Sequence, residues 1–491
     1  MLFNSYIFVL AFLPIVLIGY FGLNHFHKYS AAKVLLILAS LFFYGYFNWW
    51  YLLIIVSSVG LNYLLSRVML REKTGKALRR IAFAIALTLN IGSLFFFKYY
   101  DFFVSNVNAL FKTDWALLHI MLPLGISFFT FQQLSYVIDS YKRDKNIAAY
   151  NFFDYALFVT YFPQLIAGPI VTHDEMVPQF ADISKKKFNP DNFAAGLYGF
   201  ALGLGKKIII ADSFGLFVDA GFAEVSRLGT VNAILVMLAY TFQIYFDFSG
   251  YCDMATGIGK MMNINITMNF NSPYKAININ DFWKRWHITL TRFFTRYVYI
   301  PLGGNRKGTV RTYVNIMIVF LVSGIWHGAN WTFIVWGLLH GVAQVLTRIL
   351  DKTTGIYSKR NSKIINVVSW FFTFAFVNMA WVIFRADSLA QAGEFFGQLL
   401  RVNAISPNME LLNSMCQGGF ELIGHYIPRF SILLSIGLFC FSLFASVFMK
   451  NTNERILAFR PSYPKVFVTS GILFWCIMSF AGVSSFLYWN F

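Results

Sequence analysis

The chain has 491 residues and a formal net charge of +18, from 40 Lys and Arg against 22 Asp and Glu. Hydrophobic residues make up 57% and charged residues 13%, where an ordinary soluble domain has roughly 25% charged residues. Such a small polar fraction cannot cover a 56.3 kDa globule with water-compatible surface, which excludes a large soluble enzyme. The 57 Phe, 26 Tyr and 12 Trp exclude a disordered chain. We therefore expect an all-α polytopic membrane protein.

Long apolar blocks predict the membrane-spanning helices. A helix needs about 20 apolar residues to cross a hydrocarbon core of ~30 Å. Blocks of this kind lie at 2–23, 81–100, 120–141, 231–248, 330–349, 364–384, 430–449 and 466–489. The first lacks a basic start and a cleavage site, so we expect a retained helix rather than a signal peptide. The stretch 33–65 is interrupted at Asn48, Trp49 and Trp50, which predicts two helices joined by an aromatic turn.

Three further segments are apolar but too short or too polar to cross a membrane alone. The first contains Pro163 and the second contains Lys206 and Lys207; the three segments are 152–171, 193–222 and 249–270. Irregular backbone at membrane depth is tolerated only where it packs in protein or lines a cavity. We therefore expect re-entrant or tilted pieces around an internal chamber.

The loop charges predict an orientation. The loop 66–80 carries six basic residues against Glu72, and 142–145, 351–363 and 450–465 are also basic, which places these loops in the cytoplasm by the positive-inside rule. The loop 385–429 lacks a basic excess and is expected outside. Both termini then lie outside, if 33–65 is a hairpin.

A basic and aromatic stretch stands between the later apolar blocks. Only Asp281 opposes its eight basic residues, which are Lys275, Lys284, Arg285, Arg292, Arg296, Arg306, Lys307 and Arg311. Composition alone favours an interfacial helix that is attracted to anionic lipid. A site for a phosphate-rich ligand is the alternative, because Arg and Lys match phosphate oxygens.

Two histidines stand out as candidates for chemistry. His287 lies in the basic stretch, and His327 follows the apolar run Tyr313–Trp326. That run is about 14 residues or ~21 Å of helix, which would leave His327 within the hydrocarbon depth. An ionisable group there is a functional candidate, and a neutral imidazole can act as a general base. The alternative is a structural histidine that a neighbouring helix satisfies.

Other polar residues of the apolar blocks have structural interpretations. The small residues Gly324, Gly328 and Ala329 are expected to leave space for a substrate beside His327. His340 is expected to be structural. For Asp247 and Asp253 we favour pairing with buried basic residues, because an unpaired carboxylate would be costly. Orienting a histidine or binding a cation are the alternatives. No metal site is expected, because the four cysteines form no metal-ligand spacing.

Several segments, taken together, resemble the membrane-bound O-acyltransferase (MBOAT) family, and within it the bacterial alginate O-acetyltransferase-like branch. They agree in order and spacing and comprise FPQLIAGPIVTHDEMVPQF at 162–180, QIYFDFSGYCDMATGIG at 243–259, NFNSPYKAININDFWKRWHITLTRFFTRYVYIPLGGNRKG at 269–308, SGIWHGANWTFIVWGLLHG at 323–341 and the closing FLYWNF at 486–491. Two positions depart from the family's more usual residues, Cys252 and Thr172.

The resemblance implies a single membrane domain, with N-terminal helices in 1–119, a catalytic core in 120–345 and C-terminal helices in 346–491. It implies a ring of about 10–12 transmembrane helices, with re-entrant and interfacial helices, around a central funnel and tunnel. His327 would be the catalytic base and His287 its partner. Donor binding would fall to Lys284, Arg285, Arg292 and Arg296, and polar support to Asp247, Asp253, Trp326 and Asn330.

The resemblance also implies a reaction and its partners. Cytoplasmic acetyl-CoA would be the donor substrate, with no bound cofactor. The acetyl group would cross the bacterial cytoplasmic (inner) membrane toward an exported polysaccharide, alginate-like or peptidoglycan. A periplasmic SGNH-type protein would complete the transfer, and no nucleic acid would be involved. The alternatives are D-alanyl transfer to teichoic acid from a carrier protein, a transporter or flippase without chemistry, and a scaffold that only anchors the periplasmic partner.

Overall fold

The computed structural model describes residues 1–144, 147–357, 362–401, 406–417, 420, 429–480 and 486–487. Within these residues the secondary structure is helical and contains no β-strand. Nine of the described helices are long and apolar enough to cross a membrane. The all-α polytopic membrane fold is thereby confirmed. The described chain forms two compact units, residues 1–200 with 254–267, and residues 201–253 with 268–491.

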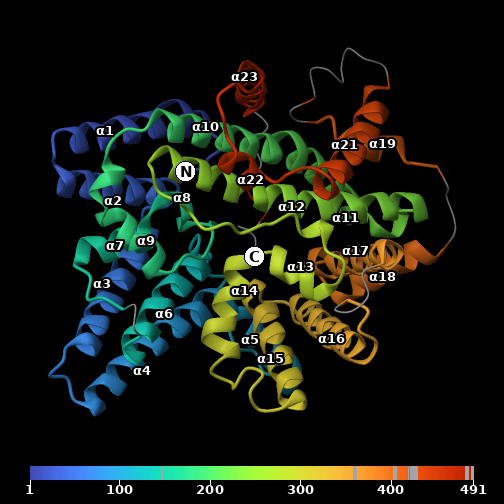
Figure 1. Cartoon of the computed structure of the whole chain (residues 1–491). Helices are drawn as coiled ribbons and strands as arrows, with labels where there is room; N and C mark the ends of the chain where they lie inside the picture. The colour runs from blue at the N-terminus through green and yellow to red at the C-terminus, as the bar shows by residue number, and fades with distance from the viewer. Residues whose placement is uncertain are drawn as a thin grey trace. The chain divides into compact units, whose positions relative to one another are not determined.

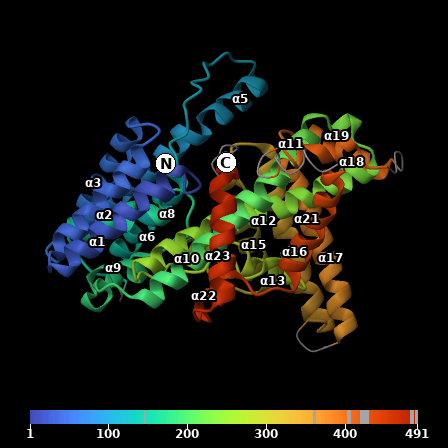
Figure 2. The ribbon, with the colours of Figure 1, turned by 90° about the horizontal axis from the view of Figure 1, so that it is seen from above.

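The first unit is built from the N-terminal helices (Figures 1 and 2). They are η1 (Phe8–Phe12), α1 (Leu13–His25), α2 (Tyr29–Gly45), α3 (Trp50–Leu70), α4 (Lys76–Leu94), η2 (Phe95–Tyr99), α5 (Tyr100–Phe111), α6 (Ile126–Lys142), α7 (Phe152–Thr160), α8 (Phe162–Leu165), α9 (His173–Ala181), η3 (Ile183–Lys186) and most of α10 (Pro190–Gly205).

The second unit contains the later helices. They are η4 (Lys206–Ala211), α11 (Asp212–Ala223), η5 (Val225–Arg227), most of α12 (Thr230–Met261), η6 (Pro273–Lys275), α13 (Ile279–Arg285), α14 (Ile288–Phe294), η7 (Thr295–Tyr299), α15 (Thr309–His327), α16 (Trp331–Thr354), α17 (Lys363–Arg385), α18 (Leu389–Leu400), α19 (Met409–Ser414), α21 (Phe430–Val447), α22 (Thr452–Leu457) and α23 (Tyr463–Met478).

Several predicted elements appear where the apolar pattern placed them. The stretch 33–65 is indeed two helices, and in the turn between them the exposed rings of Trp49 and Trp50 stack with centroids 3.9 Å apart. The segment 152–171 is broken as expected, because the chain turns at Tyr161 and Pro163 starts the short α8. The predicted outside loop 385–429 is described only in part, and the last four residues of FLYWNF lie outside the described residues.

Two of the three segments expected to be re-entrant or tilted pieces are parts of long continuous helices. Residues Pro190–Ala223 and Thr230–Met261 each form one candidate membrane span, so the prediction that 193–222 and the first half of 249–270 are too short or too polar to cross alone was wrong. The helix 120–141 is also shorter than predicted, since it begins only at Ile126. The prediction failed at 193–222 because it treated Lys206 and Lys207 as bare charges, whereas both are neutralised inside the protein.

Glycines allow the long helices to approach closely within each unit. In the first unit a Cβ on Gly196 would lie 2.5 Å from the carbonyl oxygen of Gly257. In the second, a Cβ on Gly250 would lie 2.8 Å from the carbonyl oxygen of Gly203. Membrane helices pack at short range through small residues in this way, because water provides no hydrophobic driving force there.

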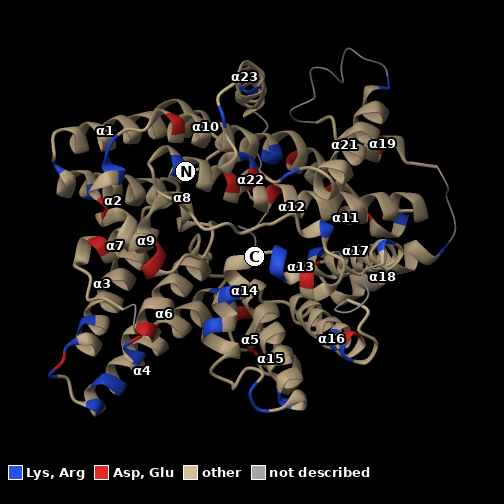
Figure 3. Cartoon of the chain, in the orientation of Figure 1, with Lys and Arg blue, Asp and Glu red and all other residues tan. Residues whose placement is uncertain are grey.

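A cluster of charges lies at the contact of η4, α11 and α12, all in the second unit. Lys207 Nζ lies 2.6 Å from Asp247 Oδ1 and 2.8 Å from Asp212 Oδ1, and Lys207 and Asp247 are both buried. Lys206 Nζ lies 2.6 Å from Asp253 Oδ2. The favoured interpretation, pairing with a buried basic residue, is therefore confirmed for Asp247, whereas the partner of Asp253 is the half-buried Lys206. Elsewhere the charges gather in loops, as at the turn between α3 and α4 (Figure 3).

We predict that Lys207→Met lowers the stability of the protein, because two aspartates lose their shared buried cation. Breaking a buried ion pair typically costs about 3–5 kcal/mol. The measurement is the apparent Tm of the full chain in detergent. Lys363→Met removes an exposed lysine and serves as the control. Adding Asp247→Asn to Lys207→Met should restore part of the loss; equal Tm values for Lys207→Met and Lys363→Met would contradict the assignment.

Candidate active site

His327 ends α15 and is enclosed by aromatic side chains. Its imidazole is 2% exposed, and its ring centroid lies 4.9 Å from Trp326, 5.0 Å from Trp336 and 5.3 Å from Phe384. The helix begins at Thr309, four residues earlier than the apolar run predicted. Burial of His327 in an apolar surrounding is thus observed, while its depth in a membrane stays a prediction.

The small residues around His327 serve helix packing. A Cβ on Gly324 would lie 2.4 Å from the carbonyl oxygen of Phe333, and one on Gly328 would lie 2.1 Å from the Phe333 ring. The expectation that these two glycines leave room for a substrate was therefore wrong, because Phe333 of α16 occupies that space.

His287 is held between α13 and α14 by a polar network. It is fully buried and adopts a left-handed backbone conformation with φ of 43°. Its Nδ1 lies 3.1 Å from Asn269 Oδ1, which also accepts hydrogen bonds from the backbone N–H and the hydroxyl of Thr289, at 3.2 and 2.9 Å. The Asn269 amide nitrogen points the other way, 3.4 Å from Cys252 Sγ.

This network assigns the protonation of His287. The amide oxygen of Asn269 carries no hydrogen and can only accept, so Nδ1 of His287 donates its N–H to it. In the neutral ring, Nε2 then carries the lone pair. Burial lowers the pKa of His287 to about 3, which keeps the imidazole neutral at physiological pH. Asn269 was missed in the sequence, because it lies 18 positions before His287.

Trp326 is the side chain that brings the two predicted catalytic histidines into one cluster. Its ring centroid lies 4.9 Å from that of His327 and 6.1 Å from that of His287. Phe248 of α12 packs edge-on against His287 at 4.9 Å. The two histidines, which are 40 positions apart in the sequence, thus share one aromatic wall.

A cavity of about 190 Å³ lies between α13, α14, η7, α15 and α16, and neither His287 nor His327 lines it. Ser323 lines it from α15, one helical turn before His327 and therefore on the same face of the helix. Thr291, Thr295 and Tyr299 line it from α14 and η7, and Arg348 lines it from α16. The cavity thus combines apolar walls with hydroxyl groups and one guanidinium.

The predicted donor-binding residues differ in their exposure and in their polar partners. Lys284 is exposed. Arg285 instead forms an ion pair with Asp281 at 2.8 Å and lies 3.3 Å from the carbonyl oxygen of Asn271. Arg292 and Arg296 are half-buried on α14 and η7, the elements that line the cavity.

Two other predicted residues have structural roles. Asn330 caps α16, since its side-chain oxygen accepts the N–H of Thr332 at 3.1 Å, and its Nδ2 donates to the carbonyl oxygen of Asp387. His340 accepts a hydrogen bond at Nδ1 from Trp283 Nε1 at 3.2 Å and is fully buried among aromatic rings. Its structural interpretation fits these contacts.

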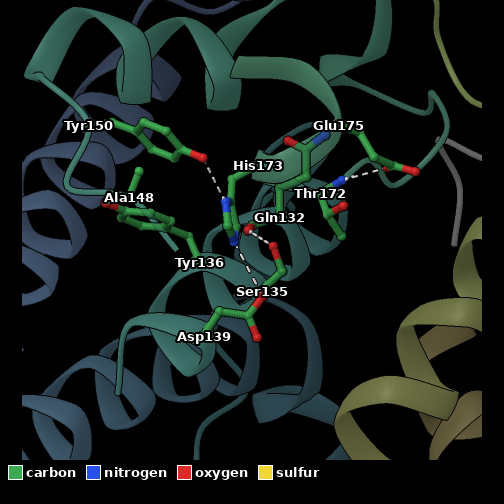
Figure 4. Close-up of polar contacts among 9 residues, drawn as sticks. All are labelled: Gln132, Ser135, Tyr136, Asp139, Ala148, Tyr150, Thr172, His173 and Glu175. Carbon is green, nitrogen blue, oxygen red and sulfur yellow. Dashed lines mark hydrogen bonds and ion pairs between the residues drawn. The ribbon is translucent and has the colours of Figure 1, made fainter. Parts of the chain in front are cut away.

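A second buried histidine network lies in the first unit (Figure 4). His173 opens α9, and its two ring nitrogens lie 3.3 Å from Asp139 Oδ2 and 3.0 Å from the hydroxyl of Tyr150. Burial, with Asp174 and Asp154 nearby, raises the pKa of Tyr150 to about 12, so its hydroxyl keeps the proton that it donates. Both ring nitrogens are engaged, which indicates that His173 fastens Asp139 of α6 and Tyr150 to α9.

The start of α9 was recognisable from the sequence. Thr172 and Glu175 form a capping box, in which Glu175 Oε2 accepts the Thr172 N–H at 3.1 Å. This Thr-x-x-Glu pattern is a known signature of a helix start. The partners of His173 were not predictable, because they lie 23 and 34 positions away.

Comparisons with known proteins identify the class of the chain. The family model of the membrane-bound O-acyltransferases, MBOAT, matches residues 142–384. The chain is 41% identical to a peptidoglycan O-acetyltransferase of Helicobacter pylori, over 100% of this chain and 98% of that protein. It is 38% identical to the probable alginate O-acetylase AlgI of Pseudomonas aeruginosa, over 81% and 74%.

A more distant relative is a teichoic acid D-alanyltransferase of Bacillus subtilis, which is 27% identical over 53% of this chain and 68% of that protein. The chain belongs to the membrane-bound O-acyltransferase family. It is a multi-pass membrane acyltransferase, which decides against a transporter or scaffold without chemistry.

The lowered pKa of His287 predicts a pH dependence of stability. An unfolded histidine titrates near 6.5, whereas buried His287 stays neutral to about pH 3. Its contribution is present above pH 6.5 and is lost as the pH falls from 6.5 toward 3, by about 2 kcal/mol at pH 5. The fall in apparent Tm from pH 7.5 to 5 should be smaller in His287→Asn than in wild type. An equal fall in Tm for the two proteins would contradict the contribution assigned to His287.

Proposed function

We propose that this chain transfers an acetyl group from cytoplasmic acetyl-CoA toward an exported polysaccharide of the bacterial cell envelope, with His327 as the catalytic base. The observation that carries the proposal is the alignment along the full chain with a peptidoglycan O-acetyltransferase. The alginate O-acetylases align over 81% of the chain and the D-alanyltransferases over 53%, so we favour peptidoglycan as the acceptor.

The chemistry requires two proton transfers and one exchange of bonds. His327 takes the proton of an acceptor hydroxyl, whose oxygen attacks the carbonyl carbon of the acetyl thioester. The carbon–sulfur bond then breaks, and the leaving thiolate takes the proton from the imidazolium. A C–O bond replaces the C–S bond, with coenzyme A as the second product. Aromatic enclosure of His327 supports this role, because it shields the reacting imidazole from water.

His287 is proposed to orient the acceptor. Because Asn269 accepts from Nδ1–H, the Nε2 lone pair of His287 can accept a hydrogen bond from a hydroxyl. The same atom cannot donate to a carbonyl oxygen while the ring is neutral. The geometry therefore favours a role in positioning the attacking hydroxyl over a role in polarising the thioester.

The donor is proposed to enter along α14 and η7. The 190 Å³ cavity beside Ser323 would accept the acyl end of its thioester arm, and Lys284, Arg292 and Arg296 would lie near the phosphates of coenzyme A. Arg285 contributes less than the sequence suggested, because Asp281 already neutralises it.

The cellular setting is proposed from the same likeness. The protein would lie in the bacterial inner membrane, with acetyl-CoA on the cytoplasmic side. An SGNH-type protein on the outer side would receive the acetyl group and pass it to the polysaccharide.

We predict that His327→Ala abolishes acetylation while the protein still reaches the membrane. Loss of a general base costs about 10²–10⁴-fold in rate. The measurement is the O-acetyl content of peptidoglycan in a deletion strain that carries each variant. His25→Ala removes an exposed histidine and should retain wild-type acetylation. Wild-type O-acetyl content with His327→Ala would refute the assigned base.

The donor assignment predicts a change in KM. Replacing Lys284, Arg292 and Arg296 together by Gln should raise the KM for acetyl-CoA more than tenfold, because hydrogen bonds to charged groups contribute roughly 1.5–3 kcal/mol each. The matched control replaces the exposed Arg71, Lys73 and Lys76 by Gln. If both triple variants keep the wild-type KM, the donor phosphates lie elsewhere.

A further inference from the structure

A second and larger cavity, of about 350 Å³, lies in the second unit, and neither His287 nor His327 lines it. Its walls come from η4, α12, α21 and α23, and they are mainly apolar. Leu438, Phe441 and Ala445 line it from α21, and Ile472 lines it from α23. The reaction proposed above makes no use of this space.

The few polar groups deep in this cavity are already satisfied. Lys206 reaches it but is paired with Asp253 at 2.6 Å. Asn451 accepts the N–H of Glu454 at 2.9 Å and donates to Asn271 Oδ1 at 3.1 Å. Lys206 and Asn451 are therefore already engaged within the protein.

Two of the basic side chains that line the cavity are adjacent to each other. Lys450 and Arg455 both line it. The Arg455 Nε donates to the carbonyl oxygen of Lys450 at 3.0 Å, which brings the two residues together. Among the described residues, neither the Lys450 ammonium nor the terminal nitrogens of Arg455 have a hydrogen-bond or ion-pair partner. The two positive charges together are complementary to an anion.

The position of these cations matches the level of lipid headgroups. They follow directly on α21, a candidate membrane span that ends at Val447, and they open the basic loop 450–465. Basic residues just beyond a spanning helix attract the phosphates of anionic lipids on the cytoplasmic side. The apolar walls on α21 lie on the side of the hydrocarbon core. Phe441 remains 48% exposed, as expected of a wall that faces lipid.

We propose that this cavity binds one anionic phospholipid, with an acyl chain between α21, α12 and α23 and its phosphate against Lys450 and Arg455. The site goes beyond acyl transfer, since none of these residues belongs to the proposed catalytic cluster. Charge complementarity selects an anionic headgroup, and the apolar walls select a lipid over a free anion.

The experiment measures lipid binding to the purified, delipidated full chain by native mass spectrometry, with phosphatidylglycerol and phosphatidylethanolamine as probes. Wild type should bind one phosphatidylglycerol at least tenfold more tightly than phosphatidylethanolamine. Lys450→Gln with Arg455→Gln should remove that preference. Ala445→Trp, which fills the cavity, should weaken phosphatidylglycerol binding at least tenfold.

The control pair is Arg460→Gln with Lys465→Gln, which removes the same charge from the same loop but does not line the cavity. It should keep the wild-type preference. If the control pair also loses the preference for phosphatidylglycerol, the preference depends on the total charge of the loop, and the proposed site is overturned. Equal binding of the two lipids by wild type would also overturn it. So would displacement of phosphatidylglycerol by millimolar inorganic phosphate, since an anion site would then suffice.

Discussion

Placing charged side chains inside an apolar bundle is the constraint on which the second unit depends. Two consecutive lysines interrupt the span 190–223, and an isolated charge at membrane depth is expensive. Lys207 is held by Asp247 and Asp212, and Lys206 by Asp253. These pairs tie η4 and α11 to α12, and Asp247 also accepts the backbone N–H of Leu487 near the C-terminus. The ion pairs thus neutralise the charges of the span 190–223. Gly203 and Gly250 let this span pack closely against α12.

The candidate active site differs from this charge cluster, because its titratable rings are enclosed by apolar side chains. His327 and His287 are surrounded by aromatic side chains, and Trp326 contacts both. Asn269 then fixes the tautomer of His287, because its Oδ1 accepts a hydrogen bond from Nδ1–H. The same oxygen also accepts a hydrogen bond from the hydroxyl of Thr289. Burial lowers the pKa of His287 to about 3, and a neutral imidazole is the form that can take a proton from a hydroxyl. In the second unit, paired charges thus hold helices together, whereas both histidines are buried among aromatic side chains.

Much of this could be predicted from the sequence, because local patterns determine it. Apolar blocks revealed most spans, the interruption at Asn48–Trp50 revealed a hairpin, and the resemblance to the MBOAT family pointed to His327 and His287. What failed depended on distant partners. Lys206 and Lys207 looked incompatible with a span because Asp247 and Asp253, which neutralise them, lie about 40 and 47 positions away. Gly324 and Gly328 looked like space for a substrate because Phe333, which fills it, belongs to the next helix. The network of His173 with Asp139 and Tyr150 left no local signal at all beyond the capping box.

The central claim is that His327 catalyses acetyl transfer from acetyl-CoA. Its most direct test is the release of free coenzyme A from acetyl-CoA by the purified protein in nanodiscs, with a small hydroxyl acceptor and the outer-side partner present. The account predicts steady release by wild type and by His25→Ala, and a loss of at least a hundredfold in His327→Ala. Release at the wild-type rate by His327→Ala would contradict it, and so would a wild-type protein that binds no acetyl-CoA and releases none.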